Sequence, residues 1–269
     1  MSKISVTTIA GLTSGGDANT VKIESGDDFV VDTNVLKVDA SNNRVGIGTA
    51  SPSQTLETAG NIFINTTGNP NLPVKTSGSG NNPNIRIQAD TNYWDLQTLF
   101  SNTNDELDFR YNGNSKMMID KEGRVTKSAQ PSFRAGMTAN QTVAQNAVVT
   151  YQSTDHNIGN HFDTSSNVGR FTCPVAGRYL FGIAMGDGNN SGISGIFALC
   201  KNGSRHYDFL EGGAPSGISG HYEKHASVVV NASANDYFDI RQISSGNKSL
   251  EGTADGLSTR NRFWGHLLG

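Results

Sequence analysis

The sequence contains one histidine pair with the spacing of a metal site, His221 and His225 in HYEKH. On a helix, residues four apart share a face, so two imidazoles could bind zinc together. The flanking residues follow a strand pattern, and the His-Glu-x-x-His order of zinc peptidases is absent. We therefore predict solvated histidines and no metal site.

DGNNSG, at residues 187–192, resembles the first half of a calcium-binding loop. Such a loop ends with a bidentate carboxylate at its twelfth position, where this chain has Ala198. We predict an ordinary turn, with a shared calcium site as the alternative.

Two glycine- and serine-rich patterns could suggest catalysis or nucleotide binding. SGISG occurs at 191–195 and 216–220, but its Gly and Ser spacing differs from the G-x-S-x-G nucleophile elbow. GIGTAS at 46–51 lacks the third glycine and the following helix of a dinucleotide-binding turn. We predict that the SGISG segments are flexible apical loops, which often carry recognition.

Glycoside hydrolysis requires two carboxyl groups at a defined separation, which a sequence does not show. No acid/base motif is present, so we predict no catalytic residue, no cofactor and no enzymatic activity; a polysaccharide depolymerase is the less favoured alternative. The carboxylates that could converge in three dimensions are Asp155, Asp163, Asp208, Glu211 and Glu223.

Aromatic and histidine side chains cluster in or beside the predicted loops of the C-terminal half, among them Trp264. Such side chains stack on sugar rings or pack in protein interfaces. The alternative is that several line the axis of an oligomer. The candidate receptor-contact residues are Asn189, Ser191, His206, Tyr207, His221 and Tyr222.

These side chains must be positioned by short strands, because the composition disfavours long helices. Glycine is abundant, with 31 residues, and supplies the positive-φ positions of tight turns, as does the frequent asparagine. The net charge is −3 and there is no basic run, which argues against nucleic-acid binding. No stretch has the roughly 18 apolar residues of a membrane span.

Aromatic residues and histidines divide the chain into segments. Seven aromatic residues precede position 129 and fourteen follow it, together with all six histidines. Only the later segment has the large side chains needed for a core of its own. We expect an N-terminal attachment segment at 1–34, a β-rich shaft at 35–128 and a head at 129–269.

The region before residue 129 reads as a series of short strands. Residues 1–34 predict two or three strands, and 35–62 alternate around Asn42-Asn43 as a β-hairpin does. Residues 65–84 read as a spacer. Asp39 and Arg44 flank one turn, and Asp120 and Arg124 flank a similar one, which is a partial repeat. Strand-like runs follow the spacer at 85–89, 93–100, 107–111 and 116–120.

Such short strands carry too few large apolar groups to bury a core alone. Winding identical chains around a common axis supplies the missing cover. Cyclic symmetry is the usual way to close such contacts, so we expect identical chains to pair around an axis in this region.

The strings VDASNNRVGIGTASP and LETAGNI resemble the shaft module of bacteriophage tail fibres and related trimeric fibre proteins. YWDLQTLFSNTNDELDFRYNGNSKMMIDKEGRV resembles the β-rich segment that often follows it, so the likeness covers about 35–127. The self-cleaving C-terminal chaperone of many such fibres is missing.

From residue 130 the pattern indicates a sandwich or jelly roll. A strand begins near Phe133, a second is expected at 147–152, and Pro174 with Gly177 makes a corner. Asn202-Gly203 is a strong hairpin signal.

These residues resemble the globular head of complement-type proteins, an antiparallel jelly roll related to the tumour-necrosis-factor fold. The departures are Cys173 at a small-residue position, Asn235 in place of a glycine, and Trp264 as an added outward aromatic. The resemblance implies a homotrimer. The matching positions are Phe133, Asn157, Gly159, Phe162, Asp163, Gly169, Phe171, Pro174, Gly177, Tyr179, Phe181, Asn202, Gly203, Asp236, Phe263, Gly265, Leu267 and Leu268.

The N-terminus shows no secretory signal, so we expect synthesis in a host cytoplasm and two buried free thiols, Cys173 and Cys200, that do not pair. A complement-like bacterial lectin would be expected to carry an export signal.

Taken together, these features predict an all-β fibre protein of a virion: an N-terminal anchor, a trimeric β shaft and a C-terminal jelly-roll head. The expected partners are its own copies, a virion tail, neck or capsid protein bound by the N-terminal segment, and a host-surface glycan or protein bound by the head. The alternative is a purely structural neck, collar or capsid fibre. Neither nucleic acid nor membrane insertion is expected.

Overall fold

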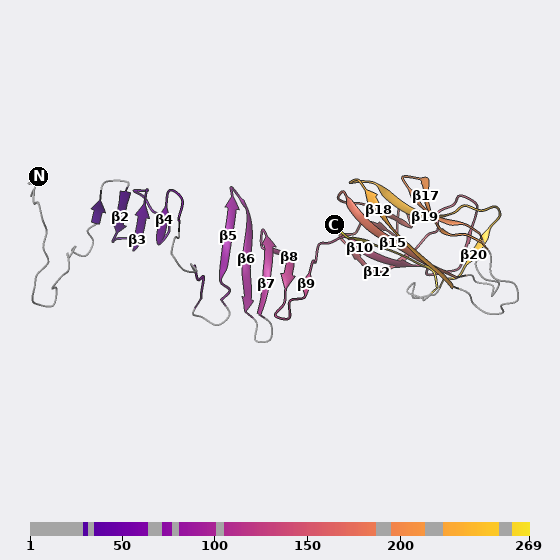
Figure 1. Ribbon diagram of the computed structural model, residues 1–269, viewed down its shortest axis with the longest axis horizontal. Helices are drawn as coiled ribbons and strands as arrows, with labels where there is room; N and C mark the ends of the chain where they lie inside the picture. The colour runs from indigo at the N-terminus through magenta and orange to yellow at the C-terminus, as the bar shows by residue number, and fades with distance from the viewer. Residues whose placement is uncertain are drawn as a thin grey trace, which may run out of the picture. The chain divides into compact units, whose positions relative to one another are not determined.

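The computed structural model describes residues 29–31, 35–63, 72–76, 81–100, 105–186, 195–212, 223–252 and 260–269. Within these ranges the regular elements are β-strands, without a helix, which confirms the all-β prediction (Figure 1). No helix of the described residues is long and apolar enough to cross a membrane. The chain forms two compact units that meet in sequence at Pro73 and Val74. The boundaries expected at 34/35 and 128/129 stay predictions.

The first unit contains a four-stranded sheet in the order β1-β2-β3-β4. The predicted hairpin is confirmed, with Asn43 in the left-handed region at φ 53°. β4 pairs parallel to β3, which the hairpin pattern did not predict. Most of the remaining strands predicted for 1–34 lie outside the described residues. The strands are β1 (Phe29–Val31), β2 (Leu36–Asp39), β3 (Arg44–Ile47) and β4 (Leu56–Thr58).

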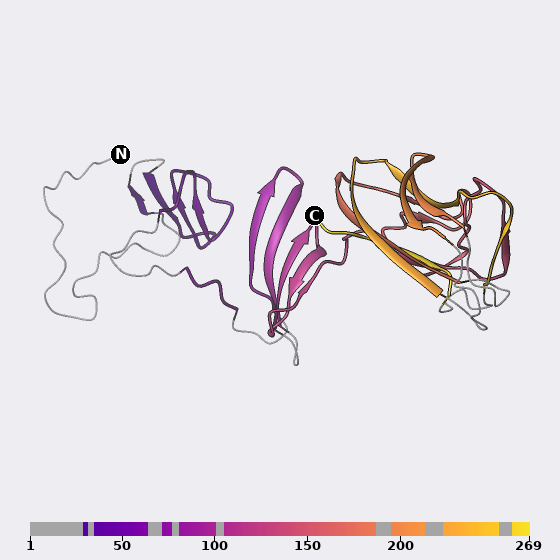
Figure 2. The same cartoon turned by 45° about the vertical axis from the view of Figure 1, so that its right-hand side comes forward.

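A second, single-layer sheet has the order β5-β6-β7-β8-β9 with antiparallel neighbours (Figures 1 and 2). The four strand-like runs predicted after the spacer correspond to its first four strands. The bounds are β5 (Asn84–Ala89), β6 (Asn92–Phe100), β7 (Asp105–Tyr111), β8 (Asn114–Ile119) and β9 (Val125–Thr126).

The two repeated turns share one feature and differ in another. Asp39 Oδ1 accepts the backbone N–H of Asn42 at 3.1 Å, and Asp120 Oδ1 accepts that of Arg124 at 2.9 Å. Both aspartates thus satisfy turn amides, which is the usual role of Asp before a turn. The two arginines have different partners. Arg124 donates to the Asp120 carboxylate, whereas Arg44 donates to the backbone carbonyl oxygen of Pro52.

The head is built from two five-stranded sheets and a short ribbon (Figure 2). One sheet has the order β12-β10-β21-β15-β18 and contains β10 (Ser132–Gly136), β12 (Ser153–Ile158), β15 (Gly177–Gly186), β18 (Glu223–Ala232) and β21 (Arg262–Leu267). The other has the order β13-β14-β19-β16-β17 and contains β13 (Phe162–Asp163), β14 (Arg170–Thr172), β16 (Phe197–Lys201), β17 (Ser204–Leu210) and β19 (Tyr237–Gln242). The ribbon pairs β11 (Gln141–Val143) with β20 (Lys248–Leu250).

The head core lies between the two sheets and is rich in aromatic rings. Phe133 and Phe181 come from one sheet and Phe171 and Phe238 from the other, all at most 1% exposed. Phe133 lies 4.8 Å from Phe171 and Phe181 lies 4.6 Å from Phe238, measured between ring centroids. Rings from both sheets therefore interdigitate, as inward-facing residues of packed sheets do.

The strand predicted at 147–152 is wrong. Val149 and Tyr151 are fully buried, so the alternation of the sequence does report which side chains face inward. The backbone makes only an isolated bridge, between Val148 and Arg241. The amide of Thr150 instead donates to the side chain of Gln141 at 3.1 Å. The segment is extended without being part of a sheet.

The prediction of two free buried thiols is confirmed for Cys173 and Cys200. Burial raises the pKa of Cys173 to about 12 and that of Cys200 to about 11. Both thiols therefore stay protonated at neutral pH, and thiols in this state are poor nucleophiles.

Two aspartates hold surface turns of the head through several donors. Asp163 accepts the backbone N–H groups of residues 165–167 at 2.8 to 2.9 Å, which holds the pKa of that carboxyl well below its usual range. Asp236 pairs with Lys201 at 2.8 Å and accepts from Asn202 at 2.7 Å, and these contacts lower the pKa of Asp236 to about 2.

We predict that Gly265→Ala destabilises the head. An added Cβ would lie 2.5 Å from the Phe133 ring and 2.7 Å from the Phe181 ring, both packed in the core. Overpacking of this kind costs about 1–3 kcal/mol in unfolding free energy. Chemical denaturation should show the loss, whereas His266→Ala, at the next, exposed position of β21, should change the unfolding free energy by less than about 0.5 kcal/mol. Equal effects of the two changes would contradict this account.

We also predict acid sensitivity from Asp236. Its pKa is lower in the folded chain than the value near 3.8 of the free side chain. Its contribution is therefore present above pH ~4 and is lost as pH falls through about 2. Asp236→Asn should lower the unfolding free energy at pH 7 by up to about 2 kcal/mol and flatten its decline between pH ~4 and ~2. Urea unfolding across this pH range measures both effects, and an unchanged acid slope would refute the assignment.

Candidate functional site

The hairpin of β16 and β17 presents the described candidate contact residues. Its turn residues, Asn202 and Gly203, have φ values of 51° and 82°, as a two-residue hairpin turn with right-handed strand twist requires. The Asn202 side chain accepts the backbone N–H of Tyr237 at 2.9 Å and donates to Asp236 at 2.7 Å. The tip of the hairpin is therefore fixed to the start of β19.

Strand β17 forms the edge of its sheet and is irregular. The pairing register with β16 shifts at two places. His206 is skipped between the pairs Arg205–Cys200 and Tyr207–Leu199, and Phe209 is skipped between the pairs Asp208–Ala198 and Leu210–Phe197. Such bulges leave a residue unpaired and redirect side chains. His206, at one of them, is exposed while its ring lies edge-on to the buried Phe238, with centroids 6.4 Å apart.

Tyr207 is 45% exposed, and its ring lies 5.7 Å from that of Phe209 in an edge-on contact. Both His206 and Tyr207 were expected in or beside loops; the structure places them within an edge strand instead. The sequence signal that could have shown this is the run SRHYDFL directly after the Asn-Gly turn.

The other four candidate contact residues lie outside the described residues: Asn189, Ser191, His221 and Tyr222. The two SGISG segments fall largely in the same unplaced ranges. The assignment of all six residues as receptor contacts stays a prediction.

Of the two histidines considered for a metal site, the structure describes His225. His225 lies on β18, with Nε2 3.4 Å from Oε1 of Glu223, and Arg262 approaches the same oxygen at 3.5 Å. Within the placed part of the chain, no group of three or more His, Cys, Asp or Glu side chains could hold a metal ion. The calcium-like segment 187–192 lies outside that part, and Ala198 at its twelfth position is buried in β16.

Three of the five carboxylates considered for hydrolysis have close structural partners within the head. Asp155 pairs with Arg134 at 2.9 Å, Asp208 with Arg205, and Asp163 with the backbone amides of its own turn. These side chains lie on strands β12, β17 and β13, and each has a structural role in the contact described.

Sequence reasoning missed a polar face on the β13-β14-β19-β16-β17 sheet. Asp239, only 1% exposed, binds Arg241 of the same strand through two contacts of 2.8 and 3.1 Å. Arg205 binds Asp208 on β17, with Nε 2.6 Å from Oδ1, which raises the pKa of Arg205 and lowers that of Asp208. The two ion pairs flank the small residues of β16, where Cys200 pairs with both Asp239 and Arg205.

Beside this face lies a small cavity of about 190 Å³, lined by Val148, Asn167, Val168, Arg170 and Asp239. The Arg170 guanidinium stacks over the Tyr237 ring at 3.8 Å. The volume is below the roughly 300–1,000 Å³ of small-molecule sites. It would hold one functional group of a ligand, while the surrounding surface would contact the rest.

The arrangement favours recognition over catalysis. The exposed His206 and Tyr207 offer stacking surfaces and hydrogen-bonding groups, and the ion pairs nearby offer fixed donors and acceptors.

Comparison with solved structures finds about half of this chain similar to several domains. The globular domain of zebrafish complement 1qA protein is 17% identical, with a TM-score of 0.40, and the match covers 52% of this chain and 98% of that one. Eiger TNF from S. frugiperda is 11% identical, with a TM-score of 0.38, over 52% and 91%. Rabbit GITRL is 12% identical, with a TM-score of 0.31, over 52% and 94%. Among curated protein sequences, none matches this chain.

Residues 132–268 match the C1q domain, a range that starts at β10 and ends just after β21. Domains of this family are generally binding domains without enzymatic activity and are typically trimeric. The matched range is half of the chain and contains both sheets of the sandwich with the core between them. The chain therefore belongs to the C1q domain family.

Proposed function

We propose that this protein is a homotrimeric structural fibre of a bacteriophage virion whose C1q head binds a host-surface glycan or protein. The observation that supports it best is the combination of a C1q head with two preceding sheets that have uncovered apolar faces. A recognition domain that acted alone would need no such sheets. A fibre needs them, because they extend the chain while pairing it with its copies.

The trimers typical of the C1q family support a trimeric head. Exposed apolar residues before the head support contact between copies along the N-terminal part of the chain as well. Several large apolar side chains of both N-terminal sheets are about half exposed, for example Ile47 at 48%, Leu56 at 59% and Trp94 at 48%. Exposed apolar surface on this scale marks an interaction site. In this proposal, residues 1–34 attach to a virion tail, neck or capsid protein, and the fibre is made in the host cytoplasm.

The trimer also gives the head its binding strength. Three identical heads on one fibre bind a repetitive cell surface with an avidity far above that of a single head. His206 and Tyr207 are the described residues best placed to make the contact, because they are exposed on an edge strand.

The intact chain is expected to have three times the mass of the 28.6 kDa protomer in solution. Light scattering coupled to gel filtration of the full-length protein measures this directly. A monomer at micromolar concentration would refute the assembly, and with it the fibre.

The double variant His206→Ala/Tyr207→Ser is expected to bind host cells at least ten-fold more weakly than the parent, because exposed aromatic residues dominate the energy of such contacts. The labelled full-length protein is first screened on a panel of bacterial strains, and the variant is then titrated on a strain that the parent binds.

Gln145→Ser, at an exposed loop position of the same head, is the matched control and should bind as the parent does. All three proteins should unfold within a few degrees of one another, since the altered side chains are exposed. If the parent binds no strain, the receptor role is withdrawn and a purely structural neck, collar or capsid fibre remains. Equal binding of all three proteins would exclude β17 as the contact surface.

A further inference from the structure

The five-stranded sheet β5–β9 sorts its side chains by face. Residues paired across antiparallel strands point to the same side. One row of paired residues runs through Ile85, Leu96, Phe109 and Met117, and a second runs through Ile87, Trp94 and Tyr111. We call the side that carries these two rows the apolar face.

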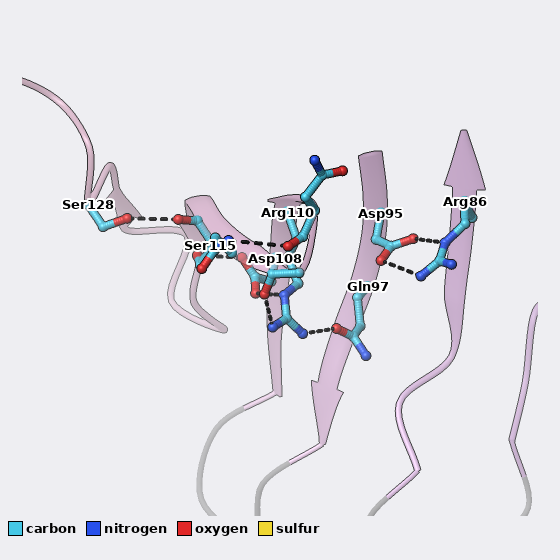
Figure 3. A network of polar contacts seen from close by, with 10 residues as sticks. Arg86, Asp95, Gln97, Asp108, Arg110, Ser115 and Ser128 are labelled. Atoms are coloured by element: carbon cyan, nitrogen blue, oxygen red, sulfur yellow. Dashed lines mark hydrogen bonds and ion pairs between the residues drawn. The ribbon is translucent and has the colours of Figure 1, made fainter. Parts of the chain in front are cut away.

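On the opposite side of the sheet, charged and polar side chains pair with one another (Figure 3). Arg86 holds Asp95 through contacts of 2.9 and 3.1 Å, and Arg110 donates to Gln97 at 2.8 Å while lying 3.6 Å from Asp108. The Asp95 pKa is lowered because Arg86 donates to that carboxylate. This polar face has internal partners for its ions and can face water without another layer.

The burial of the sheet is inverted relative to a globular protein. Asp95 and Asp108, at 5% and 2% exposed, are the buried residues among its described side chains. On the apolar face, Ile85 is 48%, Ile87 71% and Trp94 48% exposed, whereas the other residues of its two rows are half-buried. Arginine and serine side chains cover the two acids, while among the described residues Ile85, Ile87 and Trp94 of the apolar face stay exposed.

The four-stranded sheet of the first unit has the same one-sided pattern. Val38, Val45 and Leu56 are paired across its strands and share one side, while Lys37 and Glu57 lie on the other through Gly46. Val38 and Val45 are half-buried and Leu56 is 59% exposed, so each of the two sheets leaves apolar residues of one side exposed and calls for the same kind of cover. A partner present at every such sheet is most simply another copy of the chain.

The area of the apolar face limits which partner could cover it. Five strands spaced ~4.8 Å apart and about six residues long at ~3.3 Å each give a flat area of roughly 400–500 Å². A stable interface between two proteins buries about 800 Å² on each partner. This face alone is therefore too small to hold a foreign partner firmly, but it is sufficient to align copies that another part of the chain already holds together.

We propose that the apolar face of β5–β9 is the surface on which copies of this chain pack against one another, with the Arg86–Asp95 side turned to solvent. This inference rests on the homotrimer proposed above and adds which side of the sheet faces the other copies. The apolar rows are then buried at the contact between copies, as side chains in a protein core are.

The test uses two neighbouring single cysteines on β5 in the full-length protein. Ile87→Cys lies on the apolar face and Gln88→Cys on the polar face, and both side chains are exposed in the single chain. The native thiols Cys173 and Cys200 are buried, so the introduced thiol is the reactive one. We expect maleimide to label Ile87→Cys at least ten-fold more slowly than Gln88→Cys, because copies cover the first position.

A short flexible bis-maleimide supplies the second measurement. It should join Ile87→Cys chains into covalent dimers on a denaturing gel and leave Gln88→Cys chains mostly single. Equal labelling rates in a protein of trimeric mass would overturn the assigned face while leaving the proposed trimer intact. Slow labelling without cross-linked chains would mean that a segment of the same chain covers the face, which also overturns the proposal. A monomeric mass would instead remove the trimer on which the inference rests.

Discussion

A β-sheet has two faces, and any apolar face must be covered; this constraint governs every part of the chain. In the head, two five-stranded sheets cover each other, and aromatic rings from both fill the space between them. In β1–β4 and β5–β9 the strands form single sheets whose apolar sides are open. The head is thus a sandwich with an enclosed core, whereas the two preceding sheets each leave apolar residues of one side exposed.

The difference follows from the distribution of large side chains. The residues after 128 include twice as many aromatic side chains as those before. A ring such as Phe133 contacts Phe162, Phe171 and Phe263 at centroid distances below 5 Å, so it connects strands from both sheets. Gly265 is part of the same arrangement, since its missing side chain leaves room for two rings. The single sheet β5–β9 has no second sheet packed against its apolar side to enclose such rings among the described residues.

Binding by the head fits this architecture because its stability does not depend on the exposed residues. The core is complete without His206 and Tyr207, and the hairpin that bears them is anchored through Asn202 and Asp236. Edge strands and loops on such a framework can vary without loss of fold. Fold alone does not name a ligand, and the identity of the partner depends on the surface that these residues form.

The sequence alone determined the all-β class and the Asn42-Asn43 and Asn202-Gly203 hairpins. These properties depend on local turn chemistry and on the two-residue period of strands, which a sequence displays directly. Other features required the tertiary structure. Residues 147–152 alternate like a strand, yet they form no ladder. Their backbone makes an isolated bridge at Val148, and the amide of Thr150 donates to the Gln141 side chain. The bulges that turn His206 outward, the Asp239–Arg241 pair beside Cys200, and the inverted burial of Asp95 and Asp108 depend on which strands become neighbours. Strand order and register join residues far apart in the chain, and no local pattern encodes that pairing.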